Sequence, residues 1–250
     1  MVKVIVNVFY KPVQQLKNLL KYNNDVFVPV NGGCSLKGTA DAFDGLRFDD
    51  GCVDSISKMN GALNEMTSVW WAWKSLDRLD SPEYVGFNHY RRFFRLADIR
   101  AEKDADIYVA KPILCAYTLE RQYAIYHVQA DLELTYAVLD ERHAGMGREL
   151  RSYMNDHFDN FAPMNMFMMK RDLFEEWCSF IFPVLFDLKD RIDVFKRDNY
   201  QKRAVCFLCE RIFGWWCWKK SSMLRIKQLD VVERLDFKNN TLNERGTYGG

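Results

Sequence analysis

One stretch, residues 65–94 (EMTSVWWAWKSLDRLDSPEYVGFNHYRRFF), constrains the fold more than any other. Its first part, residues 65–76, lacks Gly and Pro and carries apolar side chains at helical spacing, which predicts a helix with a broad aromatic face. An Asp-Ser-Pro sequence at residues 80–82 ends the helical pattern, because proline cannot continue a helix. Residues 84–87 then predict a short buried strand. The stretch is therefore a helix–turn–strand unit, with polar residues at the carboxyl end of the strand.

The polar residues that follow this strand have the composition of an anion site. They are Asn88, His89, Tyr90, Arg91 and Arg92. In open α/β sheets, ligands bind beyond the carboxyl ends of the strands. Two arginines and a histidine at such a place suit a phosphorylated ligand. A solvated loop or a surface ion pair is the alternative interpretation, and the residues alone leave both open.

The rest of the chain alternates further apolar runs with helical patterns. Residues 2–8 form a β-branched run typical of a central parallel strand. Further strands are expected at residues 25–30, 107–110 and 163–170. Helices are expected at residues 13–22, 119–141, 172–188 and 199–218. This order predicts the α/β class, with a mainly parallel central sheet flanked by helices.

Composition limits the classes of function. A chain of 250 residues suits a single domain, residues 1–250, with a polar tail at 238–250. The net charge of +1 gives no general attraction for nucleic acid. No apolar run approaches the roughly 18–20 residues that span a bilayer, and the start has no signal-peptide pattern, so a cytoplasmic protein is expected. Seven scattered cysteines predict free thiols rather than disulfides, and one isolated CxxC pair is weak support for a zinc site.

The motifs ExMTxxWWAWK and YVGFNHYRRFF in residues 65–94 resemble the signature of a glycosyltransferase family from bacterial capsule, exopolysaccharide and O-antigen clusters. That family was long filed as a domain of unknown function, and its usual pattern is close to CELTxxYWxWKN followed by YIGxxHYRRYF. Similar segments continue through residues 49–57, 123–132, 163–170 and 200–220. The resemblance implies one GT-A-like nucleotide-binding domain that transfers a sugar from a nucleotide-sugar donor. Its members resemble inverting enzymes that use UDP-galactofuranose, with a cell-surface polysaccharide or a lipid-linked oligosaccharide as the acceptor.

The resemblance also implies roles for individual residues. It assigns the donor diphosphate to His89, Arg91 and Arg92. The residues that it places near the nucleoside or sugar of the donor are Asp54, Glu65, Thr67 and Asn165. It places Tyr123 and His127 at the acceptor, on a helix whose pattern is YxxxHxxxDL.

The catalytic base is predicted to be one of three carboxylates, Glu210, Asp131 or Asp198. A charged residue inside an apolar helix is costly to bury unless it is paired, so Glu210 is either a structural ion-pair member or a tuned base. His127 and Asp131 are four residues apart and would share one face of the predicted helix, where a structural pair is the alternative.

The sequence Asp104-Ala105-Asp106 reads as DxD, the metal-binding motif of many GT-A enzymes. In those enzymes the acidic pair follows a strand and holds Mg²⁺ or Mn²⁺ against the diphosphate. Here the pair precedes the strand at 107–110, and the end of the strand at 84–87 carries His89 and Arg91 instead. Cationic side chains are therefore expected to replace the metal, so that no cofactor and no divalent ion is needed.

Two other classes of function stay open. A non-catalytic module that binds a nucleotide sugar or phosphosugar would share the arginine site but lack a working base. A scaffold at the membrane surface would use the Trp/Lys cluster, defined as Trp215, Trp216, Trp218, Lys219 and Lys220. Such a cluster suits peripheral contact at the inner face of the cell membrane, where lipid-linked acceptors lie, although a mixture of core and surface residues explains it equally well.

Overall fold

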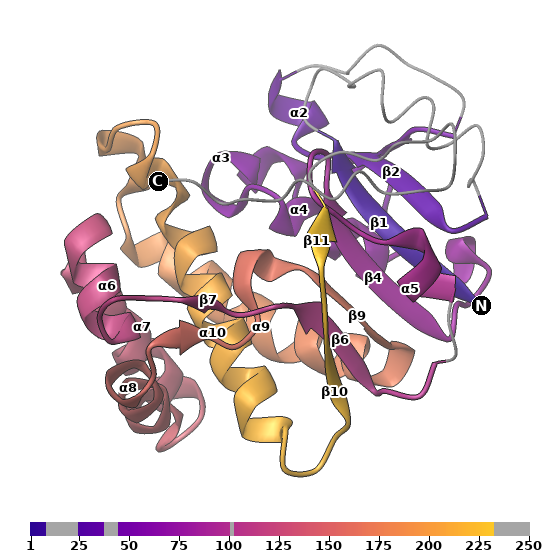
Figure 1. The fold of residues 1–250 in the computed structure, drawn as a ribbon. Coiled ribbons are helices and arrows are strands. Elements are labelled where there is room, and N and C mark those ends of the chain that lie inside the picture. Colours follow the sequence, from indigo (N-terminus) through magenta and orange to yellow (C-terminus); the bar gives the residue numbers. More distant parts are fainter. Residues whose placement is uncertain (9–24, 38–44, 101–102, 233–250) are drawn as a thin grey trace.

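The computed structural model describes residues 1–8, 25–37, 45–100 and 103–232, and its centre is a seven-stranded sheet (Figure 1). The strand order is β10-β6-β9-β4-β1-β2-β3. The strands are β1 (Val2–Val8), β2 (Phe27–Asn31), β3 (Arg47–Phe48), β4 (Tyr84–His89), β6 (Ile107–Ala110), β9 (Phe167–Lys170) and β10 (Ile226–Leu229). Every neighbouring pair is parallel except the two that involve β9, which runs antiparallel to both β4 and β6. The predicted class, α/β with a mainly parallel sheet, is confirmed.

Helices cover one face of the sheet. Alternate strand residues such as Ile5, Val85 and Phe87 belong to the larger core, which they share with α3, α4, α9 and α10. The helices are α2 (Cys34–Lys37), α3 (Asn60–Leu63), α4 (Met66–Trp73), α5 (Leu96–Arg100), α6 (Leu119–Tyr126), α7 (Gln129–Arg142), α8 (Met146–Asp156), α9 (Arg171–Arg191) and α10 (Ala204–Lys220). Successive strand residues point to opposite sides of a sheet, so Ile5, Val85 and Phe87 share the face that α3, α4, α9 and α10 cover.

The opposite face has a smaller core that contains Val4, Val6 and Tyr84. It packs against α5 and a short antiparallel ribbon of β5 (Phe93–Phe94) and β11 (Val231–Val232). A second ribbon pairs β7 (Ile113–Leu114) with β8 (Asp159–Asn160). Short 3-10 turns link the elements: η1 (Ser57–Met59), η2 (Leu76–Leu79), η3 (Pro163–Asn165), η4 (Val194–Lys196) and η5 (Gln201–Arg203).

Gly86 lies where three central strands come closest. A Cβ atom at this position would lie 3.0 Å from Cγ2 of Val4 on β1 and 3.2 Å from the carbonyl oxygen of Phe167 on β9. Both distances are shorter than ordinary contacts of a Cβ atom, so a side chain at this position would push against its neighbours. Gly86 thus lets β4 pack tightly between β1 and β9.

Several predicted elements differ from the structure. The strand expected at 163–170 is the turn η3 followed by β9, and the helix expected at 119–141 is divided into α6 and α7. The strands β10 and β11 were not predicted. The helix expected at 13–22 and the tail at 238–250 lie outside the described residues, and the single-domain boundary at 1–250 stays a prediction.

Candidate functional site

The chain reverses direction at the carboxyl end of β4. His89 and Arg92 form an antiparallel bridge, in which the His89 N–H donates to the Arg92 carbonyl at 3.1 Å. Tyr90 and Arg91 therefore lie at the tip of a tight turn. Arg91 is exposed and its guanidinium lies 4.9 Å from the centre of the Tyr90 ring, while Arg92 is half-buried. Two guanidinium groups and an imidazole thus stand where α/β sheets bind their ligands.

His89 is oriented by a contact with a distant turn. Its Nε2 lies 2.7 Å from the carbonyl oxygen of Met164. A carbonyl can only accept, so Nε2 carries the proton and Nδ1 of the neutral ring is an acceptor. His89 can therefore donate a hydrogen bond to a phosphate through Nδ1 only as the imidazolium ion.

The turn η3 brings Asn165 into contact with Glu65, and both residues were predicted to lie near the donor. Asn165 Nδ2 donates to Glu65 Oε1 at 3.3 Å and to the carbonyl of Cys206 at 3.5 Å. Both Met164 and Asn165 have a positive φ, 67° and 51°. This backbone conformation is uncommon for residues with a side chain, most of all for a bulky one such as methionine.

Thr67 and Asp54, the other residues predicted near the donor, have local contacts. Thr67 is fully buried, and its hydroxyl donates to the Asn64 carbonyl at 3.1 Å while accepting from Asn60 Nδ2 at 2.9 Å. Asp54 is exposed, and its backbone carbonyl accepts from Trp70 Nε1 at 2.9 Å. Thr67 therefore braces the start of α4, and the Asp54 side chain remains open to a ligand.

The acidic loop around Asp49 is held together by a buried carboxylate. Asp49 accepts hydrogen bonds from the backbone N–H of Gly33 at 2.6 Å and from the Ser57 hydroxyl at 2.5 Å. Its side chain also accepts from the N–H of Cys34 at 3.2 Å. These bonds join three segments of the loop, so Asp49 is a structural residue.

Glu210 is an ion-pair member. Its Oε1 accepts from Arg211 Nη1 at 2.9 Å and from Asn160 Nδ2 at 3.1 Å. Gly214 makes room for this contact, because a Cβ there would lie 2.1 Å from Asn160 Oδ1. Arg211 also donates to Gln122 at 3.0 Å. Of the two roles that the sequence left open for Glu210, these contacts fit the structural one.

Asp131 and Asp198, the other predicted bases, are also engaged. Asp131 is 4% exposed and holds Arg197 through both carboxylate oxygens, with Nη2 to Oδ1 at 2.8 Å. Asp198 is exposed, and its Oδ1 accepts from the backbone N–H groups of Tyr200 and Gln201, both at 2.8 Å. The contacts of Asp131 fit a structural role, and Asp198 holds the backbone where the chain enters η5.

The prediction that His127 and Asp131 share one helix face is wrong. His127 has an extended backbone and ends α6, whereas Asp131 lies in the first turn of α7. His127 and Val128 have an extended backbone, which interrupts the helical hydrogen bonds between α6 and α7. The sequence has no Gly or Pro at this point, so it did not predict the break.

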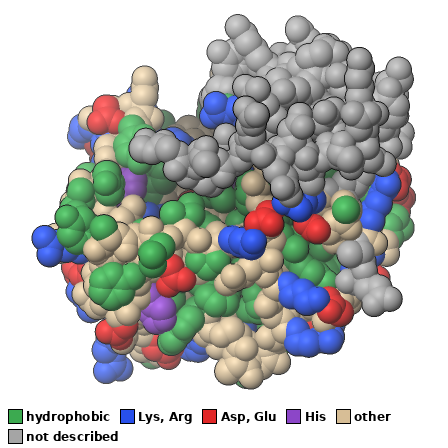
Figure 2. All heavy atoms as spheres, in the orientation of Figure 1, with side chains coloured by type: hydrophobic (Ala, Val, Ile, Leu, Met, Phe, Trp, Pro, Cys, Tyr) green, Lys and Arg blue, Asp and Glu red, His purple; other side chains and the backbone are tan. Residues whose placement is uncertain are grey.

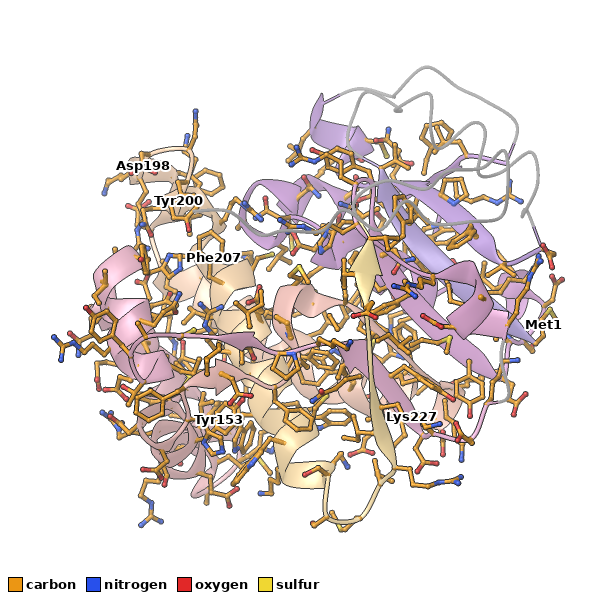
Figure 3. The ribbon with its side chains drawn as sticks, viewed as in Figure 1. Met1, Tyr153, Asp198, Tyr200, Phe207 and Lys227 are labelled. Carbon is orange, nitrogen blue, oxygen red and sulfur yellow. The ribbon has the colours of Figure 1, made fainter. Side chains whose placement is uncertain are left out.

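His127 instead belongs to an aromatic cluster made of Tyr123, His127, Tyr200 and Phe207. Its ring is 4.3 Å from Phe207 and 4.7 Å from Tyr123, and it stacks on Tyr200 at 5.6 Å. Figure 3 labels Tyr200 and Phe207 near the start of α10, with Tyr153 toward its other end. Burial lowers the pKa of His127 to about 4, so the ring is neutral at pH 7. The Tyr123 hydroxyl is buried and has no hydrogen-bonding partner among the described residues.

Two buried asparagines lie at or near the carboxyl ends of β2 and β4; Asn88 was named from the sequence only as one of the polar residues after the strand, and Asn31 was not singled out. Asn31 ends β2 and is fully buried, and neither polar atom of its side-chain amide has a partner within the described ranges. Asn88 on β4 accepts a long bond of 3.4 Å from the Phe94 N–H, and its Nδ2 has no partner in the same part of the chain. In the sequence, each of these asparagines directly follows a predicted apolar strand, and that position could have indicated a functional role. Buried unpaired amides are rare, so these groups mark the same edge of the sheet as polar.

The DxD sequence lies at the amino end of β6, as expected. Asp106 pairs with Lys170 at 2.6 Å and accepts from the Arg225 N–H at 2.8 Å, and Asp104 pairs with Lys227. Both carboxylates thus anchor the sheet, away from the end of β4. Within the described ranges, no group of three or more His, Cys, Asp or Glu side chains is arranged to hold a metal ion. The prediction of metal-independent activity stays a prediction.

The Trp/Lys cluster is divided between core and surface. Trp215 and Trp216 are buried, whereas Trp218 is 40% exposed and Lys219 is also exposed. Lys219 and Lys220 pair with Glu149 and Glu176. Figure 2 shows hydrophobic side chains instead on the side that carries α6 and β7, where Leu114 is 81% exposed. None of the helices in the described ranges is both long and apolar enough to cross a membrane.

Comparison with known proteins places these features in a family. Residues 12–221 match the family model described as "Domain of unknown function (DUF4422)". A solved apo structure of the WbbM bifunctional glycosyltransferase has a similar fold, with a TM-score of 0.75 and 19% sequence identity. The similarity covers 94% of this chain and 45% of that one, so the chain spans less than half the length of that protein. No curated protein matches the sequence.

Proposed function

The chain belongs to the DUF4422 family, and on that premise we propose that it transfers a sugar from a nucleotide-sugar donor to a hydroxyl group of a glycan. The observation that carries this proposal is the cationic turn at the carboxyl end of β4, where His89, Arg91 and Arg92 suit a diphosphate. The fold shared with the WbbM bifunctional glycosyltransferase supports it. The finer proposal is inverting transfer of galactofuranose from UDP-galactofuranose.

The donor would lie across the carboxyl ends of β1, β2 and β4. A guanidinium offers two parallel N–H donors to a phosphate, which is why arginine suits this position. Arg91 is free to move toward a ligand because its side chain is exposed. Asn165 and Glu65 lie beside this turn through the Met164 contact with His89 and would face the donor sugar.

The acceptor would lie along α6 and the start of α10. The rings of Tyr200, His127 and Phe207 form a surface against which the apolar face of a sugar can pack. The unpaired Tyr123 hydroxyl lies within the same cluster. The proposed acceptor is a growing cell-surface polysaccharide or a lipid-linked oligosaccharide. For the latter, the exposed apolar residues of α6 and β7 suit contact with a membrane better than the Trp/Lys cluster does, because Trp215 and Trp216 of that cluster are buried.

We also propose that the reaction needs no divalent metal. Negative charge grows on the diphosphate as the glycosidic bond breaks, and cationic groups positioned there stabilise it. At the strand end where many GT-A enzymes hold a metal, this chain carries His89 and Arg91. The carboxylates of the DxD sequence are occupied by Lys170 and Lys227.

The release of UDP from candidate UDP-sugars, measured with and without an acceptor glycan, tests the proposal. Acceptor-dependent release from UDP-galactofuranose is the expected result. Binding of the UDP-sugar without turnover across a panel of acceptors would instead support the non-catalytic binding module. Absence of both binding and turnover for every nucleotide sugar would overturn the proposed function.

A further inference from the structure

Glu65 is a buried carboxylate at the meeting point of three elements. It precedes the first turn of α4, and its side chain contacts Asn165 of η3. Burial is the largest cause that raises the pKa of the Cys206 and Cys209 thiols, and the negative charge of Glu65 is the second. The carboxylate therefore also lies near α10. Only 8% of the residue is exposed.

Glu65 has few partners among the described residues. Its side chain forms no ion pair with a described Lys, Arg or His, and the hydrogen bond that it accepts from Asn165 is long at 3.3 Å. An ionised carboxylate can accept about four hydrogen bonds, so most of its capacity is unused. A buried charge in this state costs stability. The carboxylate therefore retains acceptor capacity for a proton or for a hydrogen bond from a ligand.

The backbone around Glu65 is strained. Asn64 has φ 43°, and the contacting turn has φ 67° at Met164 and 51° at Asn165. Residues with side chains rarely adopt such angles, and such strain clusters at active sites. Three of the six non-glycine residues with positive φ in the described chain thus belong to the residue before Glu65 and to the turn that contacts it.

The same turn connects Glu65 to the proposed diphosphate site. The Met164 carbonyl accepts from His89, and the next residue, Asn165, donates to Glu65. One residue therefore separates the contact with the cationic turn from the contact with the carboxylate. A donor sugar bound beside the cationic turn would therefore lie near Glu65, and so would a hydroxyl that attacks it.

We propose that Glu65 is the general base of the transfer reaction, an assignment that rests on the proposed function. Glu65 takes the proton from the acceptor hydroxyl as the oxygen of that hydroxyl forms a bond to the anomeric carbon. The bond between the anomeric carbon and the phosphate oxygen breaks, and its electron pair leaves with the nucleoside diphosphate. Glu210, Asp131 and Asp198 are left with their structural contacts, and Asn165 positions the base.

Replacement of Glu65 by Gln tests the assignment. The amide oxygen still accepts from Asn165, so the fold should persist, and UDP binding measured by calorimetry should stay within about two-fold of the parent. Turnover should fall by about 10²–10⁴ because the proton acceptor is lost. The decrease of turnover toward low pH, which reports protonation of the base, should disappear from any residual activity.

Three further variants keep the test decisive. Glu65→Asp retains a carboxylate and should recover part of the turnover and the low-pH decrease. Glu149→Gln removes a surface carboxylate paired with Lys219 and should match the parent. Glu210→Gln, which changes a different paired carboxylate, should lose less turnover than Glu65→Gln.

The outcomes separate this assignment from the function itself. A parent enzyme that transfers sugar while Glu65→Gln turns over at the parental rate would overturn the assignment and leave the function intact. A folded Glu65→Asp that is as inactive as the Gln variant, and without any low-pH decrease, would also overturn it. A parent that transfers no sugar would refute the proposed function instead.

Discussion

Asp131 provides a direct test of whether a predicted catalytic residue is structural. Asp131→Asn removes the charge from a side chain that is 5% exposed and that holds Arg197 with two hydrogen bonds. The amide group of asparagine would point N–H donors at the guanidinium, so one bond is lost and replaced by a repulsive contact. Removal of one partner of a buried ion pair costs about 3–5 kcal/mol. Arg197 is 20% exposed and regains some hydration, so we expect a loss of about 2–3 kcal/mol.

This loss is measurable by thermal and urea denaturation. For a chain of this length, each kcal/mol lowers the melting temperature by about 2–4 °C, so the expected decrease is about 4–12 °C. The matched control is Glu133→Gln, two residues along the same helix, because Glu133 pairs with Arg151 and both side chains are 44% exposed. An exposed pair contributes about 0–1 kcal/mol, so this variant should stay within a few degrees of the parent.

Turnover decides between the two roles of Asp131. At a temperature where the variant is folded, a structural Asp131 predicts a turnover within about three-fold of the parent, since no proton transfer is removed. A variant that melts like the parent but loses about 10² or more in turnover would refute this reasoning. Asp131 would then be the base, and the ion pair with Arg197 would serve to orient it.

Three further predictions follow from the site. Arg91→Ala should leave the melting temperature nearly unchanged, because the side chain is exposed, yet lose about 10²–10³ in turnover. Arg91→Lys should recover only part of that turnover. Parental turnover in Arg91→Ala would exclude a diphosphate role for this residue. Activity should survive EDTA, and a strict requirement for Mn²⁺ would contradict the cationic site. The folded-state pKa of His127, about 4, lies below its unfolded value of about 6.5, so this residue contributes stability above pH 6.5 that is lost as pH falls toward 4. In denaturation experiments at several pH values, His127→Phe should therefore lose less stability over that range than the parent does. An equal loss would show that the ring is not buried as described.

The elements that were predicted well have strong local patterns. The β-branched run of β1 and the buried run of β6 match their predicted limits, because a strand buried on both faces reads as a continuous apolar segment. In contrast, β10 has the sequence IKQL and is only half-buried at the edge of the sheet. An edge strand needs little apolar character, so its sequence does not distinguish it from a loop.

The contacts that decide the roles of the carboxylates could not be read from the sequence. Asp131 and Arg197 are 66 residues apart, and Glu65 and Asn165 are 100 apart. No spacing rule links such pairs, since they meet only when the sheet and helices are assembled. The family motif identified Glu65 and Asn165 as candidates, but their contact and the absence of a cationic partner for Glu65 among the described residues became visible only in three dimensions.

The reversed direction of β9 explains how this site is assembled. Because β9 runs antiparallel to β4, Phe167 at its start pairs with Phe87 near the end of β4, while Lys170 pairs with Tyr84. The residues that precede β9 therefore lie at the carboxyl edge of the sheet. A parallel strand in the same place would put them at the opposite edge, where Lys170 and Asp106 form their ion pair. The reversal thus carries the strained η3 turn to the cationic end of β4, where Met164 contacts His89 and Asn165 reaches Glu65.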